Sequence, residues 1–255
     1  MASPKATPTI ALISHSSVVS QAELADYVPH YQAYVSRLLK EVYEVDAQIV
    51  APQDSRKPSH AWAMYFADQL NVSGAAGYHS DSHHQPAAYI DVNDEPLFTG
   101  SHELAEMLVD PSGNSLYSAP SPDPADKGKE VQILDEVCDP CEDGSFGIAV
   151  DGVSLSDFIT PSYGTGPGGP FDAAEKLTEP REVAINGYIS WIDGHVWKQA
   201  TNFAGEGFKV RVLGPAGQAK NEGKSLREWV DEQTRAHIAR LGISLTSSLA
   251  AASTT

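Results

Sequence analysis

Cysteine, basic residues and long hydrophobic runs are all scarce in this chain, and each shortage excludes a class of protein. Two cysteines in 255 residues cannot form a disulfide framework. No apolar run is long enough to span a bilayer, and no hydrophobic stretch follows Met1 as it would in a signal peptide. We therefore expect no membrane partner and a cytoplasmic location.

The charge balance is strongly acidic. Seventeen Lys and Arg residues face 34 Asp and Glu residues, which gives a formal net charge of −17. Because nucleic acid binding needs a broad basic surface, we expect no nucleic acid partner. The carboxylates either gather around a cation or keep the protein soluble. Hydrophobic residues make up 41% of the chain, which is enough for a sizeable core.

The first half of the chain predicts an α/β layer. Short apolar or β-branched runs predict strands at residues 9–13, 47–51, 61–67, 74–79 and 87–92. Apolar residues recur at three- and four-residue steps over 21–42 and predict an amphipathic helix, in which Pro29 is expected to cause a kink or a restart. This order of elements favours helices packed on a mixed, twisted sheet.

The second half predicts a β-rich segment closed by a helix. Residues 111–129 are rich in Pro, Ser, Gly and Asp and predict a loop, which is the natural seam between 1–112 and 131–245. Strands are expected at 131–134, 146–150, 153–159, 188–191 and 209–212, with a hairpin turn at Asp151-Gly152 and a loop at 160–169. A helix is expected from Ser225 to Arg240, ended by Gly242. Residues 246–255 predict a disordered tail, and the fold class is α+β.

The stretch 101–111 carries the densest chemistry. Ser101 can cap a helix N-terminus there, and Pro111 is expected to end the helix. At about 100° per residue, one imidazole and three carboxylates fall within roughly 100° of one another, while the apolar residues face the other way. The polar face comprises His102, Glu103, Glu106 and Asp110.

This spacing suggests a metal site. In an HExxH helix two histidines at i and i+4 bind zinc, and the intervening Glu activates a metal-bound water. Here Glu106 stands at the second ligand position, and a carboxylate there can still reach the ion. It makes a bound water less acidic and favours harder cations. The alternative is a solvated helix face, because this short pattern also occurs by chance.

A second acidic segment lies at residues 134–144, where five carboxylates surround Cys138 and Cys141. Glu136 or Asp139 could supply a further metal ligand, or the segment could form a Ca²⁺ loop. A thiolate zinc site needs more ligands, because no second CxxC is present, and a redox CxxC lacks its usual helix start. The remaining interpretation is an acidic turn.

Two further positions could line a cleft. His79 follows a strand and is expected beside the sheet, while His83 and His84 suit a surface turn equally well. Tyr163 sits in a Gly-rich loop that could present its phenol to a substrate or simply anchor the loop. Neither a phosphate-binding Gly-rich motif nor a serine nucleophile elbow is present.

Four blocks together resemble a family of uncharacterised bacterial and phage-encoded proteins. The blocks are Gly77-Tyr78-His79, the SHExxEMxxDP stretch of 101–111, the acidic segment from Glu136 to Glu142, and residues 153–161. The layout of this family is also similar to the zincin metallopeptidase core, in which an HExx helix follows a twisted sheet and faces a cleft. The resemblance implies a zincin-like fold with a shared site, although Glu106 departs from the zincin pattern.

Two functions follow from these observations. The first is a peptidase-like metal-dependent hydrolase with a peptide or protein substrate, in which zinc is the expected ion and calcium or manganese are alternatives. His102, Glu106 and either Glu136 or Asp139 would be its ligands, Glu103 the general base, and Asp110 would orient His102 or hold the helix end. The second is a non-catalytic zincin-like protein, homo-oligomeric or virion-associated, with a structural cation or a carboxylate network.

Overall fold

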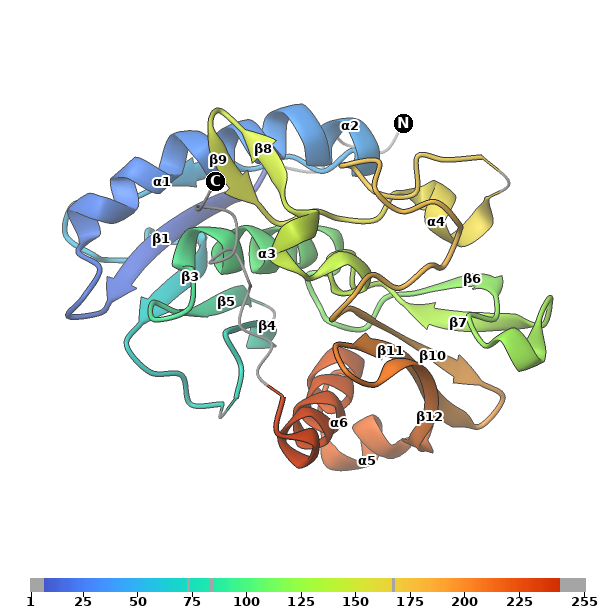
Figure 1. Ribbon diagram of the computed structural model, residues 1–255. Coiled ribbons are helices and arrows are strands. Elements are labelled where there is room, and N and C mark those ends of the chain that lie inside the picture. Colours follow the sequence, from blue (N-terminus) through green and yellow to red (C-terminus); the bar gives the residue numbers. More distant parts are fainter. Residues whose placement is uncertain (1–6, 73, 83–84, 167, 244–255) are drawn as a thin grey trace, which may run out of the picture.

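Two five-stranded sheets form the frame of the protein in a computed structural model, and one helix, α3, crosses the middle of the molecule (Figure 1). The structure describes residues 7–72, 74–82, 85–166 and 168–243. Helices and mixed sheets are both prominent, so the expected α+β class is confirmed. The predicted tail at 246–255 and the predicted turn at His83 and His84 lie outside the described residues.

The first sheet has the strand order β2-β1-β3-β5-β4. Its members β1, β2, β3 and β5 run parallel, and β4 pairs antiparallel with β5 at the edge. Their bounds are β1 (Thr9–His15), β2 (Gln48–Val50), β3 (Trp62–Ala67), β4 (Gly77–Ser82) and β5 (Gln85–Asp91). The five strands expected from the sequence are therefore present, although β4 begins three residues later than predicted.

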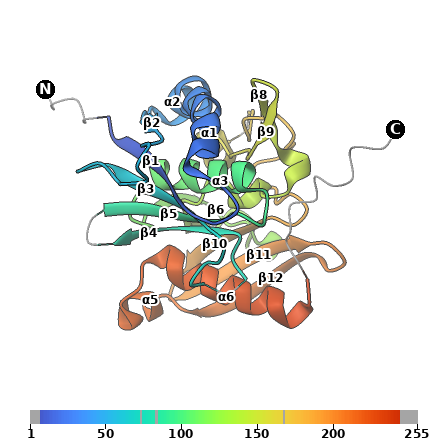
Figure 2. The ribbon, with the colours of Figure 1, turned by 90° about the vertical axis from the view of Figure 1, so that its left-hand side faces the viewer.

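The long first helix is continuous but not uniform. It comprises α1 (Gln21–Tyr34), a π-helical turn at Val35–Leu39 and α2 (Lys40–Tyr43). Ser20 and Glu23 form a capping box at its start. The break expected at Pro29 does not occur, because Pro29 lies inside α1, and the irregularity falls at the π-turn instead. Figure 2 shows α1 and α3 on the same face of the first sheet.

Helix α3 (Pro96–Val109) begins earlier than the sequence suggested. Ser101 is not its cap: the helix starts at Pro96, where a missing N–H costs nothing, and Ser101 lies buried inside it. Gly100 faces the hydroxyl of Tyr31 so closely that a Cβ would overlap it. This close packing fixes α3 against α1.

The second sheet is antiparallel, in the order β12-β11-β10-β7-β6. Its strands are β6 (Leu116–Pro120), β7 (Glu130–Leu134), β10 (Tyr188–Asp193), β11 (Val196–Phe203) and β12 (Gly207–Pro215). The prediction of a loop over 111–129 was wrong at β6 and at a 3-10 turn, Pro124–Asp126, because pairing with β7 orders a Pro- and Ser-rich segment. Strand β11 was missed, since its polar residues interrupt the apolar pattern.

Smaller elements connect the frame. The hairpin of β8 (Ile148–Val150) and β9 (Val153–Leu155) turns at Asp151-Gly152 as expected, with both residues at positive φ. The region 160–169, predicted to be a loop, contains the short helix α4 (Pro161–Thr165). Two further 3-10 turns, Asp139–Cys141 and Gly144–Phe146, lie in the acidic segment.

Helix α6 (Leu226–Leu241) follows the short α5 (Gln218–Glu222) and packs on the second sheet. Ser225 and Glu228 form its capping box, and Gly242 ends it at a φ of 66°, as the sequence indicated. Trp229 packs with the buried Trp197 of β11, and each fully buried aromatic side chain contributes about 1.5–3 kcal/mol. This anchoring determines which side chains of α6 point towards α3.

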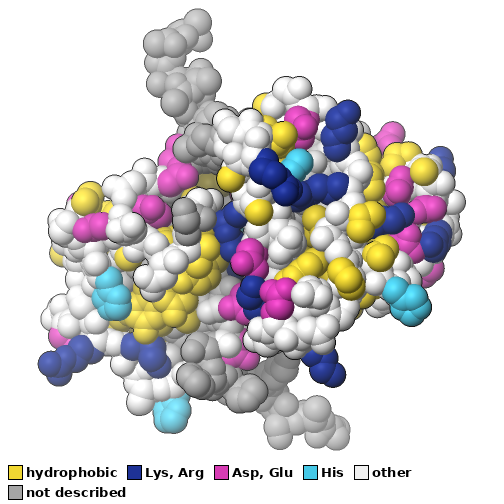
Figure 3. Space-filling model, turned by 90° about the horizontal axis from the view of Figure 1, so that it is seen from below, with side chains coloured by type: hydrophobic (Ala, Val, Ile, Leu, Met, Phe, Trp, Pro, Cys, Tyr) yellow, Lys and Arg dark blue, Asp and Glu magenta, His cyan; other side chains and the backbone are white. Residues whose placement is uncertain are grey.

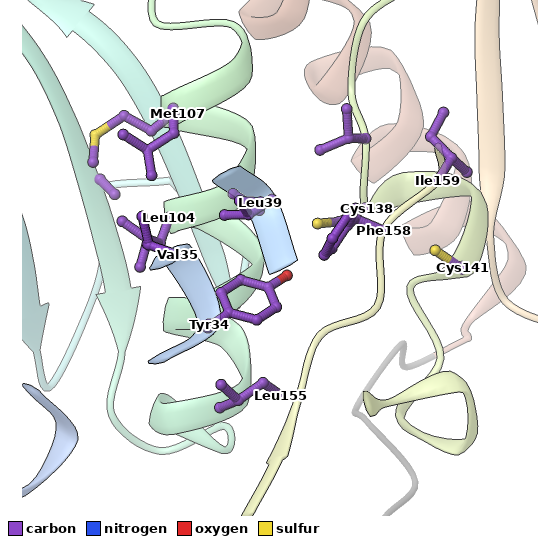
Figure 4. Close-up of a cluster of buried hydrophobic side chains, with 14 of the residues drawn as sticks. Tyr34, Val35, Leu39, Leu104, Met107, Cys138, Cys141, Leu155, Phe158 and Ile159 are labelled. Carbon is purple, nitrogen blue, oxygen red and sulfur yellow. The ribbon is translucent and has the colours of Figure 1, made fainter. Parts of the chain in front are cut away.

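The main core joins three distant segments (Figure 4). Side chains of the first helical stretch and of α3 face a cluster from the acidic segment and the β9 region, including Cys138, Phe158 and Ile159. Both cysteines are free thiols and buried. None of the described helices is long and apolar enough to cross a membrane.

The outer face of the first sheet carries a row of stacked rings, which pair His15 with Tyr65, Tyr65 with Tyr89, and Tyr89 with Tyr78. Figure 3, which views the molecule from below, shows a hydrophobic patch flanked by charged side chains of both signs. The chemistry-bearing residues lie instead on the inner side, where α3 meets the acidic segment and α6.

Candidate metal centre

Helix α3 places the predicted residues inside the protein. His102, Glu103 and Glu106 are 7%, 3% and 0% exposed. A solvated helix face is therefore excluded, and three ionisable groups require partners in the interior. Those partners come from the acidic segment, from β4 and from α6.

The imidazole of His102 meets two carboxylates. Its Nε2 lies 3.3 Å from Glu106 Oε1, one helical turn away, and 3.5 Å from Asp139 Oδ1. Asp139 stands in the 3-10 turn that follows β7, and the backbone N–H of Cys138 donates to Glu106 Oε1 at 3.2 Å. The sequence predicted His102 and Glu106 as ligands, with Glu136 or Asp139 as the third, and the tertiary structure places Glu106 and Asp139 beside the same imidazole nitrogen.

His79 approaches the same helix from the edge strand β4. Its Nε2–H donates to the backbone oxygen of Asp110 at 3.1 Å, so Nδ1 is the nitrogen that faces the carboxylates. Nδ1 lies 3.5 Å from Glu103 Oε2 and 3.8 Å from Glu106 Oε2. A hydrogen bond from the far nitrogen to a carbonyl is the arrangement that orients a metal-binding histidine.

Gly77 makes the approach of β4 to α3 possible. A Cβ at this position would lie 2.8 Å from both Cγ and Oε1 of Glu103, which is closer than real Cβ contacts. A side chain at residue 77 would therefore displace Glu103. The Gly-Tyr-His block thus supplies a close contact from Gly77 and a buried imidazole from His79.

Arg227, a residue that the sequence analysis missed, is the central cation of this cluster. Its side chain on α6 is buried, and its Nη2 donates to Glu106 Oε2 at 2.9 Å and to Glu103 Oε2 at 3.1 Å. The apolar residues of α6 predicted only a hydrophobic face and gave no indication of a buried arginine. Residues 227, 230, 231 and 234 share one buried side of the helix, but three of them are polar, so their i, i+3, i+4, i+7 spacing gave no hydrophobic signal in the sequence.

Glu136 pairs with Arg227 rather than with His102. Its Oε2 accepts from Arg227 Nε at 2.9 Å, while Arg227 Nη1 donates to the backbone oxygen of His79 at 2.9 Å. Asp231, one turn along α6, lies 3.6 Å from the same Nη1. Of the two acidic candidates for a third ligand beside His102, only Asp139 stands next to that imidazole.

Asp110 holds the end of α3. Its carboxylate accepts from the backbone N–H of Ser115 at 2.7 Å and from the hydroxyls of Ser115 and Ser112 at 2.9 and 3.1 Å. Of the two roles expected for Asp110, these contacts match fixing the helix end. Its backbone oxygen orients His79, so the residue still supports the cluster.

Tyr163 lies away from the cluster. It is fully buried, and its hydroxyl donates to the backbone oxygen of Glu182 at 2.8 Å. The phenol therefore anchors the segment around Glu182 and is not among the residues that line the cavity beside His102. This position agrees with the loop-anchor alternative and not with presentation to a substrate.

The electrostatics of the cluster reflect a surplus of buried carboxylates. Burial and the neighbouring Glu106 raise the pKa of Glu136 and of Asp139 well above their ordinary values. Burial disfavours ionised Glu106, but His102 and Arg227 outweigh it and lower the pKa of this carboxyl. Burial also opposes the charged form of His102, yet Glu106 and Asp139 raise its pKa well above the usual range.

A cavity of about 480 Å³ opens beside these residues. Its wall includes His102 and Glu103 from α3, Gly77 from β4, and Arg227 and Asp231 from α6. Glu142, another wall residue from the acidic segment, has its pKa raised to about 7 by burial. The cluster is therefore buried on most sides but can be reached from one cavity.

Two groups of buried side chains are close enough to bind a metal ion. In each group the ligand atoms lie within 4.8 Å of one another, and the groups share Glu106. One comprises His102, Glu103 and Glu106, and the other comprises His79, Glu106 and Glu136.

Comparison with known protein families, curated proteins and solved structures finds no match to this chain. All four sequence blocks that carried the resemblance contribute to one region, since the backbone N–H of Ser156 donates to the Ser101 hydroxyl within α3 at 2.7 Å.

Proposed function

We propose that this protein is a metal-dependent hydrolase of zincin-like layout that acts on peptide bonds. His102, Glu106 and Asp139 would hold the ion, and Glu103 would be the general base. The observation that carries the proposal is the spacing of the ligand atoms. In a tetrahedral zinc site with bonds of about 2.0–2.1 Å, neighbouring ligand atoms lie roughly 3.3–3.4 Å apart. Nε2 of His102 lies 3.3 Å from Glu106 Oε1 and 3.5 Å from Asp139 Oδ1, so the two spacings that involve the imidazole fit such a site. Glu103 is the third member of the compact group around His102 and Glu106, so its carboxylate would also lie close to the ion.

The charge of the cluster supports a bound cation. Four buried carboxylates lie around one guanidinium, and a fifth, that of Asp139, lies beside His102. Three of these five carboxyl groups have raised pKa values. Such an excess must be neutralised by protons or by a metal ion. The carboxylates are Glu103, Glu106, Glu136, Asp139 and Asp231. We propose zinc as the ion because a nitrogen ligand is present, with manganese or calcium as alternatives because the other ligands are oxygens.

The other residues of the centre have defined tasks in this proposal. A bound divalent ion would polarise a carbonyl group and make water more acidic. Glu103 lines the cavity, and its Oε2 is held by Arg227 while Oε1 packs against Gly77. This orientation keeps the carboxylate at the cavity wall, where it can accept a proton from a reacting water.

The cavity suits an extended peptide. Residues 74–77, which lead into β4, line it, and β4 is an edge strand of the first sheet. An edge strand offers unpaired backbone groups to which an extended chain can add as a further strand. Because such pairing uses only backbone groups, we propose extended peptides as the substrate class without assigning a preference for particular side chains.

A second candidate function is a non-catalytic protein of the same layout, with assembly partners in a cell or a virion. The observation that favours it is the ion pair of Arg227 with both Glu103 and Glu106. An internal guanidinium then replaces the cation that a catalytic centre needs. The two candidate functions differ in whether the protein hydrolyses peptides in a reaction that requires Glu103.

Elemental analysis and peptide hydrolysis test the proposal together. Protein purified without added metal, and protein dialysed against Zn²⁺, Mn²⁺ or Ca²⁺, should contain about one ion per chain. Asp139→Asn should weaken metal binding at least about tenfold. Glu103→Gln should retain the ion and lose about 10²–10⁴-fold in the rate of hydrolysis of a mixed peptide library. Glu232→Gln, at an exposed position on α6, is the matched control.

The outcomes separate the candidates. Failure of all three metals to bind would overturn the metal centre. One bound ion, with no hydrolysis above that of Glu103→Gln, would overturn the enzyme and support the structural alternative.

A further inference from the structure

The two carboxylate oxygens of Glu106 serve different partners. Oε1 lies beside His102 Nε2 and accepts from the N–H of Cys138. Oε2 lies 2.9 Å from Arg227 Nη2 and 3.8 Å from His79 Nδ1. A carboxylate with one oxygen in each of two environments is the usual bridge between two neighbouring cation positions.

The position on the Oε2 side has the features of a ligand site. His79 and Glu136 are 1% and 4% exposed, and His79 Nδ1 and Glu136 Oε1 have no hydrogen-bond partner in the described part of the chain. Because Nε2 of His79 donates to a backbone oxygen, Nδ1 can offer its lone pair. Ligand atoms of His79, Glu106 and Glu136 lie within 4.8 Å of one another. Two unpartnered buried atoms thus point to a cation as their partner, independently of the count of acidic residues.

Arg227 places its positive charge at this position. Its Nε donates to Glu136 Oε2 and its Nη2 to Glu106 Oε2, each at 2.9 Å. The guanidinium therefore contacts two of the three candidate ligands through their charged oxygens and reaches the third, His79, through its backbone oxygen at 2.9 Å. Its N–H groups donate to Glu136, to Glu103 and Glu106, and to the His79 backbone oxygen, so none of these bonds reaches the imidazole Nδ1, which has no hydrogen-bond partner among the described residues.

We infer that Arg227 occupies the second of two adjacent cation positions, and that removing its guanidinium opens a divalent-cation site formed by His79, Glu106 and Glu136. One imidazole and two carboxylates suit Mn²⁺ or Zn²⁺. This inference rests on the proposed function only in assuming that the first cation position is the metal site at His102. In the native chain Arg227 is then a positioning residue that holds Glu103 and Glu106 beside a single ion.

The test is Mn²⁺ binding by Arg227→Met, which removes the charge and keeps much of the side-chain length. The variant should bind one Mn²⁺ more than the wild type at equilibrium. If the wild type holds one ion, the variant should hold two about 3.5–4 Å apart, and its electron paramagnetic resonance spectrum should show two coupled ions instead of isolated Mn²⁺. Adding His79→Ala should weaken the additional site at least about tenfold.

Matched variants and a stability measurement keep the inference falsifiable. Arg227→Lys retains a cation, and Arg235→Met removes a partly exposed arginine two turns along α6, so both should keep the wild-type stoichiometry. Arg227→Met should melt at a lower temperature than the wild type in chelator and regain most of the loss in Mn²⁺. An Arg227→Met protein that binds no additional ion, or that Mn²⁺ does not restore, would overturn the inference.

The number of ions bound by each protein distinguishes failure of this inference from failure of the proposed function. One ion in the wild type and one in Arg227→Met would support the His102 centre and overturn the second site. No ion in the wild type and one in Arg227→Met would overturn the His102 centre and support the second site.

Discussion

Glu106 lies between His102 and Arg227, with Oε1 3.3 Å from the imidazole Nε2 and Oε2 2.9 Å from the guanidinium Nη2. All three side chains are buried, so each charge depends on the others for compensation. The stability of the centre should therefore depend on this shared carboxylate.

Replacing the shared carboxylate should destabilise the fold strongly. Glu106→Gln leaves a buried guanidinium and a buried imidazole with a neutral neighbour, and breaking a buried ion pair in this way costs about 3–5 kcal/mol. Urea unfolding at neutral pH measures the loss. The exposed Glu232→Gln should change the free energy of unfolding by less than about 0.5 kcal/mol. Equal effects of the two substitutions would contradict a central role for Glu106.

Adding one methyl group at Gly77 should disturb the centre through Glu103. In Gly77→Ala the new Cβ would lie 2.8 Å from Cγ and Oε1 of Glu103, so α3 and β4 must separate or the carboxylate must move. We expect a loss of about 1–3 kcal/mol in the free energy of unfolding, measured by urea denaturation. Gly217→Ala is the control, because a Cβ added at that position would meet nothing within 4 Å. A stable Gly77→Ala protein would show that the contact is tolerated.

The buried carboxyl groups of Asp157 and Asp172 should make stability depend on pH. Burial and a hydrogen bond with Asp172 raise the pKa of Asp157 to about 8, whereas an unfolded Asp has a pKa of about 3.9. The folded state therefore keeps a proton that the unfolded state releases. Its stabilising contribution is complete below about pH 4 and is lost progressively as pH rises to about 8.

The variant Asp157→Asn should remove this dependence, because its amide can donate to Asp172 at any pH while its oxygen still accepts from the N–H of Ala174. Between pH 5 and pH 8 the wild type should lose about 2–4 kcal/mol more than the variant in the free energy of unfolding. Urea titrations at the two pH values give the comparison. Parallel losses in both proteins would rule out a shared proton in this pair.

Thiol chemistry should report on the packing of the acidic segment. Cys138 and Cys141 are free and fully buried, and burial raises the pKa of both thiols well above the usual value. A thiol reagent such as iodoacetamide should label neither residue in the native protein and both after denaturation without reductant. Mass spectrometry counts the labels. Rapid native labelling would contradict the buried packing, and no labelling after denaturation would indicate a disulfide.

Local sequence patterns predicted the three regular elements of the centre, α3, β4 and α6, although not the true start of α3 or the 3-10 turn that carries Asp139. The spacing of His102 and Glu106 is a property of any helix, so their common face followed from a period of 3.6 residues. The succession of strands along the chain up to β5, the caps of α6 and the hairpin at Asp151-Gly152 likewise depend on residues close together in the sequence. Asp139 was one of two acidic candidates, and the sequence offered no means of separating it from Glu136.

Only the tertiary structure decided which charges meet. Arg227 contacts Glu106 across 121 residues of chain, and its direction depends on how Trp229 packs on the second sheet. The same packing pairs Glu136 with the guanidinium and leaves Asp139 beside His102. The sequence by itself therefore determined a helix with an imidazole and carboxylates on one face. The fold determined its partners, because contacts between distant segments follow from the burial of whole elements and not from local periodicity.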